Sequence, residues 1–145
     1  MDKLLVLMFM LFCHFVADYQ VQGILANMKQ KSWWIGSVPD LHKTKYKNDY
    51  KAALIAHSFE WSFIMMLPLF YEVYYGVYGF EYYSVVTVVT YIALLIGNTI
   101  AHYFVDNAKA NKNSINLIED QLLHLSQVIV TWVVFMSFTW RFFYY

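Results

Sequence analysis

Four long stretches of this chain carry very few charged residues, and each of them contains one histidine. We expect them to form helices over about residues 4–28, 52–71, 84–106 and 120–140. A helix of about 20 residues crosses roughly 30 Å of hydrocarbon, and the last three stretches reach that length by themselves. The first reaches it only if its polar C-terminal half faces protein. The sequence therefore predicts an all-α integral membrane protein, a four-helix bundle that forms one domain over residues 1–145.

The composition agrees with a bilayer protein and excludes several other classes. The chain is 60% hydrophobic and only 14% charged, which is too apolar for an ordinary soluble domain. Its formal net charge is zero, so we expect no nucleic-acid partner. The single cysteine, Cys13, excludes an internal disulfide. A charged start before a short apolar run also resembles a signal peptide, but we favour a retained first helix.

The lysines predict the orientation of the helices. Eight of the ten basic residues lie in the two connections that would share one side of the membrane: Lys29, Lys31, Lys43, Lys45, Lys47, Lys51, Lys109 and Lys112. Positive residues favour the cytoplasmic side, so both termini are predicted to lie outside. With alternating crossings, all four histidines then fall at a similar depth near the cytoplasmic face. We expect a multi-pass protein of a bacterial inner (plasma) membrane whose direct surroundings are membrane lipid.

The histidines are accompanied by carboxylates at helical spacing. Three pairs are four residues apart, so each pair shares one helix face: His14–Asp18, His102–Asp106 and Asp120–His124. Ionisable groups within apolar helices are costly and mark functional sites. Imidazole and carboxylate groups bind zinc, manganese or iron. We therefore predict a divalent metal centre, with zinc as the first candidate, held by His14, Asp18, His57, His102, Asp106 and His124.

Other polar residues near these pairs are candidates for supporting or catalytic roles. Asp120 is predicted to be a ligand or a general base. Lys109 shares the face of His102 and Asp106, so it either holds a phosphate or pairs with Asp106. Three further residues are predicted to support the ligands: Gln22, Gln121 and Glu60.

These residues also carry a family resemblance. The segment His14-Phe-Val-Ala-Asp18-Tyr19-Gln-Val-Gln22 resembles the H-x-x-x-D-[FY]-x-x-Q motif of Domain of Unknown Function 3307, a family of small membrane proteins from bacteria and their phages. His102 to Lys109 is similar to its H-x-x-x-D-x-x-K motif, and Asp120 to His124 to its D-Q-x-x-H motif. The family name implies no activity. A more distant likeness to membrane-bound metal-dependent hydrolases implies a phosphoester substrate.

The function predicted from the sequence is a membrane-embedded metal-dependent hydrolase. Its substrate would be a phosphoester of a lipid or a lipid-linked phosphate at the cytoplasmic leaflet, with Asp120 and Lys109 in the catalytic machinery. One alternative is a metal, proton or small-solute conductor, in which the same residues form a relay. Others are a haem-binding bundle with two axial histidines and an accessory protein that acts through membrane contacts alone. The sequence leaves the oligomeric state open.

Overall fold

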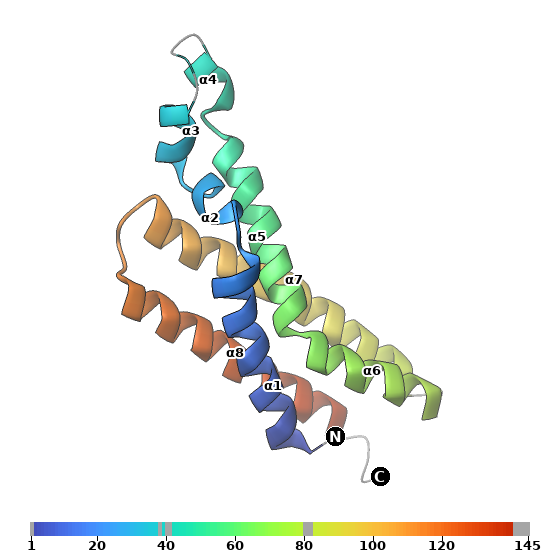
Figure 1. Cartoon of the computed structure of the whole chain (residues 1–145). Helices are drawn as coiled ribbons and strands as arrows, with labels where there is room; N and C mark the ends of the chain where they lie inside the picture. Colours follow the sequence, from blue (N-terminus) through green and yellow to red (C-terminus); the bar gives the residue numbers. More distant parts are fainter. Residues whose placement is uncertain (1, 38, 40–41, 80–82, 141–145) are drawn as a thin grey trace.

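The computed structural model describes residues 2–37, 39, 42–79 and 83–140, and the regular structure of this part is entirely helical (Figure 1). The elements follow in the order α1 (Lys3–Val16), η1 (Ala17–Val21), α2 (Leu25–Met28), α3 (Lys31–Ser37), α4 (Lys43–Tyr46), α5 (Asp49–Met65), α6 (Leu67–Gly79), α7 (Tyr83–Ala110) and α8 (Leu117–Trp140). The all-helical class predicted from the sequence is confirmed for these residues.

The first predicted helix is interrupted rather than continuous to residue 28. Asp2 caps α1, its Oδ1 accepting from the backbone N–H of Leu4 at 2.8 Å. The helix then widens into one π-helical turn, η1, an irregularity that is frequent at functional sites. Gly23 follows with a φ of 47°, a conformation that a residue with a Cβ adopts only with strain. The chain therefore changes direction before the short helix α2 begins.

The second predicted segment is bent at Met66. The helices α5 and α6 meet there at 54°. Pro68 has no N–H to donate to the turn before it, which explains the break. Helix α6 continues to Gly79, so residues 72–79 are helical, whereas the sequence predicted an aromatic loop there. The rest of that predicted loop falls largely outside the described residues.

The helices α7 and α8 form an antiparallel hairpin and are each longer at the connecting turn than predicted. Asn113 adopts a φ of 50° in that turn, which asparagine tolerates better than most residues. Asn116 caps α8 by accepting from Ile118 and Glu119 at 2.9 and 3.0 Å, and Glu119 accepts from the Asn116 N–H at 2.8 Å. This reciprocal capping box begins α8 before Asp120.

The long helices pack side by side, and the short ones extend beyond them. Helix α1 contacts α5, α6 and α8, and α7 packs against α5, α6 and α8. The start of α1 and the end of α8 lie at one end of the molecule, where the Trp132 side chain donates to the Lys3 carbonyl at 3.0 Å (Figure 1). Helices α2 and α3 pack against α5 at the other end. The core between the long helices is apolar: Val6, Met10, Trp61, Met65, Leu69, Val128 and Phe135.

The outer surface of these helices is strongly apolar. Three described helical stretches are long and apolar enough to cross a membrane: Lys3–Val21, Val85–Ala110 and Leu117–Phe138. The bent pair α5–α6 adds a fourth if it counts as one broken span. Large side chains point outward along them, such as Phe12, Ile100 and Phe104, each more than half exposed. Soluble monomers rarely expose so much contiguous apolar surface, so the fold is compatible with a membrane protein.

Candidate metal centre

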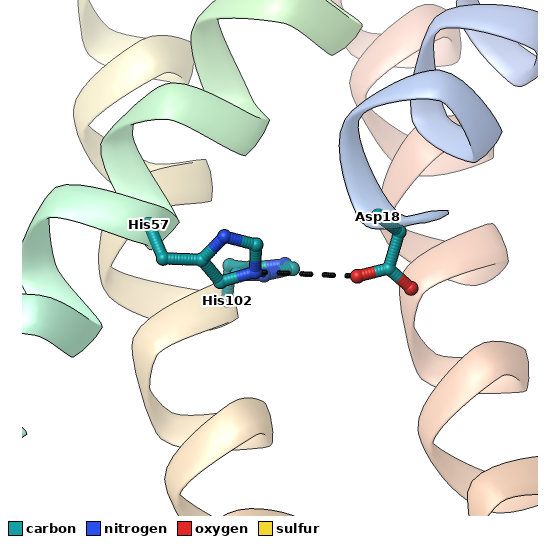
Figure 2. Close-up of side chains that lie close together, drawn as sticks. All are labelled: Asp18, His57 and His102. Atoms are coloured by element: carbon teal, nitrogen blue, oxygen red, sulfur yellow. Dashed lines mark hydrogen bonds and ion pairs between the residues drawn. The ribbon is translucent and has the colours of Figure 1, made fainter. Parts of the chain in front are cut away.

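The predicted site residues come from four separate helical segments and meet inside the molecule. Asp18 lies in η1, His57 in α5, His102 and Asp106 in α7, and His124 in α8. Figure 2 shows Asp18 facing the rings of His57 and His102 across the gap between their helices. The four histidines predicted as ligands are completely buried, and Asp106 is 2% exposed. The residues of the separate sequence motifs thus come together in one polar cluster within an apolar interior.

Asp106 lies at the centre of this cluster because its two oxygens face different histidines. Its Oδ1 is 3.6 Å from Nε2 of His102 and 3.6 Å from Nε2 of His124. Its Oδ2 is 3.3 Å from Nε2 of His57. Nε2 of His57 is also 3.3 Å from Nε2 of His102. A carboxylate with this orientation can bind one cation or bridge two neighbouring ones.

Asp18 approaches the same histidines from the opposite side. Its Oδ1 is 4.0 Å from Nε2 of His57, and its Oδ2 is 3.9 Å from Nδ1 of His124. Gln121 donates from Nε2 to Asp18 Oδ2 at 2.7 Å, and Gln22 donates from Nε2 to Asp18 Oδ1 at 3.4 Å and to the Asp18 backbone carbonyl at 2.6 Å. The structure therefore brings both predicted supporting glutamines to one carboxylate, where they fix its orientation.

Five of the six predicted metal ligands form two overlapping groups. In each group, ligand atoms lie within 4.8 Å of one another: Asp18, His57 and His102 in one, and His102, Asp106 and His124 in the other. These buried groups can hold a metal ion. Several ligand atoms have no hydrogen-bond partner among the described residues, including both ring nitrogens of His124 and Oδ1 of Asp120. Buried polar atoms without partners are costly, and a bound cation would satisfy them.

His14 lies beside these groups but belongs to neither. Its ring centroid is 5.9 Å from that of His124. Its Nδ1 accepts a hydrogen bond at 3.1 Å from Nε1 of Trp61, so in the neutral ring the proton sits on Nε2. Neither nitrogen then offers a free lone pair to a cation. In this arrangement His14 acts as a partner of Trp61 rather than as a ligand.

Trp61 is a central residue that the sequence prediction missed. It is completely buried, and its ring stacks on His102 with centroids 4.2 Å apart. His102 also stacks on His124 at 4.2 Å. Trp61 follows His57 by four residues on α5, so helical spacing was an available signal. These stacked rings leave no space for a macrocycle between His102 and His124, which disfavours haem ligation by that pair.

The lysine contacts differ from those predicted. Lys109 pairs with Asp120 at 2.5 Å, whereas the sequence offered Asp106 or a phosphate as its partner. The partner of Asp106 is instead Lys29, whose Nζ lies 2.7 Å from Oδ2. Lys29 was interpreted only as part of the topogenic lysine-rich segment. Its role could not be inferred from spacing, because 77 residues separate it from Asp106.

Two further predicted site residues occupy different surroundings. Asp120 lies at the edge of the cluster, its Oδ1 3.9 Å from Nε2 of His124. Among the described residues, Glu60 belongs to neither group of ligand atoms, and its Oε2 is buried without a hydrogen-bond partner. The contacts therefore give Glu60 no supporting role for these ligands.

A second buried polar group lies further along α7 and α8. Asn98 donates to Oγ1 of Thr131 at 2.9 Å, and Gln127 donates to Oδ1 of Asn98 at 2.9 Å. Interhelical bonds of this kind hold helices together where no water competes. Beyond this group, towards the end of the molecule where α1 starts and α8 ends, the interior around Val6 and Phe135 is mostly apolar, with the Tyr91 hydroxyl buried in the same cluster.

A cavity opens at the other end of the cluster. Its volume is about 460 Å³, and it is bordered by η1, α2, the end of α7 and the start of α8. Charged and amide side chains line it: Asp18, Gln22, Lys29, Asp106, Lys109 and Gln121. The ligands Asp18 and Asp106 thus lie at the boundary between the buried histidines and an accessible space.

Comparison of the chain with protein-family models, with curated proteins and with solved structures gave no match. The function proposed for this protein is therefore based on the residues of the cluster and on the cavity beside it.

Proposed function

We propose that this protein is a membrane-embedded, metal-dependent hydrolase that cleaves a phosphoester of a lipid or a lipid-linked substrate. The observation that carries the proposal is the group His102, Asp106 and His124, which is buried among apolar helices with His124 nitrogens that have no hydrogen-bond partner among the described residues. Mixed nitrogen and oxygen ligands favour zinc, with manganese or iron as alternatives.

The proposed reaction consumes one water molecule. A divalent cation lowers the pKa of a bound water towards neutrality and polarises the phosphoryl group. Oδ1 of Asp120, which has no hydrogen-bond partner in the described chain, accepts the proton of the attacking water. A bond forms between the water oxygen and phosphorus, the ester P–O bond breaks, and the leaving alkoxide takes up the proton that Asp120 accepted, which returns Asp120 to its carboxylate form. The products are an alcohol and a phosphate.

The proposed membrane arrangement follows from the same residues. We propose four spans, with α5 and α6 together as one bent span, in a four-helix membrane bundle of the inner membrane. The lysine-rich connections then lie in the cytoplasm, as the positive-inside bias favours, and the cavity opens towards the cytoplasmic leaflet. The motif resemblance to Domain of Unknown Function 3307 supports a bacterial or phage membrane protein and is part of this proposal.

One observation favours a proton- or solute-conducting alternative. The group of Asn98, Gln127 and Thr131 extends the polar interior beyond the histidines. The apolar core that follows it, around Val6 and Phe135, opposes a continuous relay, because conduction requires polar groups or water through the full depth. Hydrolysis therefore agrees better with a cluster that is open at one end and closed by apolar side chains at the other.

Metal content and activity measured together test the proposal. Wild-type protein purified in detergent after metal-replete growth should carry near-stoichiometric zinc, manganese or iron and should release phosphate from phosphatidic acid or a polyprenyl phosphate. A chelator should abolish the release. Asp106→Asn should lose metal and activity together, because it removes an anionic ligand while keeping the side-chain shape.

Glu119→Gln is the matched control, since Glu119 neighbours Asp120 on α8 but accepts from the Asn116 backbone instead of facing the cluster. This variant should keep both metal and activity. Metal-free wild-type protein after metal-replete expression would overturn the proposal.

A further inference from the structure

Two lysine ammonium groups line the cavity beside the cluster, and each pairs with a carboxylate that is a candidate metal ligand or lies beside one. Lys29 contacts Asp106 at 2.7 Å, and Lys109 contacts Asp120 at 2.5 Å. Both lysines line the cavity of about 460 Å³. Asp106 belongs to a group that could hold a metal ion, and Oδ1 of Asp120 lies 3.9 Å from Nε2 of His124 in that group, so a divalent cation there would compete with both ammonium groups for these carboxylates.

The backbone at Lys29 is fixed, so only its side chain is free to reorient. Asn111, at the end of α7, donates from Nδ2 to the Lys29 carbonyl at 3.1 Å and accepts from the Lys31 N–H at 2.7 Å. These two bonds hold the start of the lysine-rich segment against α7. A lysine side chain has a flexible four-carbon stem, so its ammonium group can leave Asp106 without movement of this anchor.

The formal net charge of the site changes from negative to positive when a divalent metal ion binds. Asp18, Asp106 and Asp120 supply three formal negative charges, and Lys29 and Lys109 supply two positive ones, which leaves one negative charge with neutral histidines. One divalent cation turns this balance to one positive charge. A site with a net negative charge repels an anion, whereas a site with a net positive charge attracts one.

We propose that this cavity binds a phosphate-type anion through Lys29 and Lys109, and that a bound divalent metal prepares the site by replacing their ammonium groups on Asp106 and Asp120. The inference rests on the proposed function and deepens it, because it names the group that the enzyme holds and the order in which metal and substrate bind. Lysine ammonium groups are common phosphate binders in proteins. The cavity volume also accommodates a phosphate group with part of its substituent.

Phosphate binding to purified protein, measured by calorimetry with and without one equivalent of manganese, tests the inference. Inorganic phosphate should bind the manganese-loaded wild type and not the chelator-treated protein. Lys29→Ala and Lys109→Ala should each weaken phosphate binding roughly 10- to 100-fold, since each removes a charged donor. Lys31→Ala is the matched control: it removes an equal charge two residues from Lys29, outside the cavity lining, and should leave binding unchanged.

The two lysine variants should have the opposite effect on the metal. Removing an ammonium group that competes for Asp106 or Asp120 should leave manganese affinity equal to or higher than that of the wild type. A merely structural role for Lys29 would not lower phosphate affinity while preserving metal affinity. Lys109 is 37% exposed, so its variant is expected to fold even if Lys29→Ala is unstable.

A second arm of the experiment distinguishes the source of the phosphate. Binding of inorganic phosphate and binding of phosphatidic acid to manganese-loaded protein in nanodiscs should be compared. Phosphatidylcholine nanodiscs serve as the blank. Binding of either probe through both lysines supports the inference and identifies the source. Binding of neither by metal-loaded protein, or equal phosphate binding without metal, would overturn the inference and leave the proposed function standing. Failure to bind metal at all would overturn both.

Discussion

Replacing Gln121 with alanine tests most directly whether hydrogen bonds from α8 orient the carboxylates of Asp18 and Asp120. The Gln121 amide donates to Oδ2 of Asp18 at 2.7 Å and to Oδ2 of Asp120 at 3.3 Å. Hydrogen bonds to charged groups contribute about 1.5–3 kcal/mol each. Loss of a residue that orients metal ligands typically weakens metal binding about 10- to 100-fold, which corresponds to about 1.4–2.8 kcal/mol. The 2.7 Å bond to Asp18 taken alone predicts a loss of the same size, so Gln121→Ala should weaken metal binding about 10- to 100-fold.

The same helix supplies a matched control for this variant. Gln127 is also part-buried on α8, but its amide donates to the carbonyl and Oδ1 of Asn98 at 2.8 and 2.9 Å. Gln127→Ala should therefore lower stability by about 1 kcal/mol while its metal affinity stays within about twofold of the wild type.

Metal affinity should be measured by competition with a chromophoric chelator, and stability by thermal unfolding in the same detergent. Equal losses of metal affinity in Gln121→Ala and Gln127→Ala would refute the reasoning, because the effect would then be general softening of α8. Wild-type affinity in Gln121→Ala would refute it as well, since the carboxylates would need no orientation from α8.

Three further outcomes are expected. Trp61→Phe keeps a buried ring but removes the donor to His14, so stability measured by circular dichroism should fall by about 1–3 kcal/mol with metal content unchanged; loss of the metal would contradict this and would show that the Trp61 ring positions His102. Acidification should weaken metal binding in chelator competition, because protons compete with the cation for imidazole nitrogens, and a pH-independent affinity would contradict histidine ligation. In a Cys13→Ser background, cysteines placed at 44–47 should resist membrane-impermeant labels in intact cells and cysteines at 74–79 should react; the reverse pattern would invert the orientation.

The cluster was predictable where its members are related by helical spacing. His102 and Asp106 are four residues apart on α7, so periodicity alone placed them on one face. The sequence also predicted Asp18 and His124 as members of the cluster, because helices that cross the membrane in alternating directions place these residues at a similar depth. Spacing also placed Trp61 on the face of His57, but its stacking on His102 and the pairing of Lys29 with Asp106 depend on which helices become neighbours, and one sequence without tertiary contacts does not specify that.

The element boundaries show which local signals were available. The spacing of Asn116 and Glu119 is that of a capping box, so the early start of α8 was readable from the sequence. Pro68 was visible too; it lies in the first turn of α6, where proline is tolerated, so it marks the start of a new helix after the bend at Met66 and not the end of the segment. The π-helical turn η1 was not predicted, because the sequence was interpreted as one regular helix through these residues.

The two ion pairs explain how a cluster that could hold a metal ion can fold without one. An isolated carboxylate in an apolar interior is strongly unfavourable, and Asp106 is 2% exposed. The Lys29 ammonium group neutralises it from the cavity side, and Lys109 does the same for Asp120. Because both lysines approach from the accessible end, a metal can replace them without disturbing the buried histidines. Under the proposed function, the lysines that favour one orientation of the chain in the membrane would then become available, at the mouth of the site, for an anionic substrate.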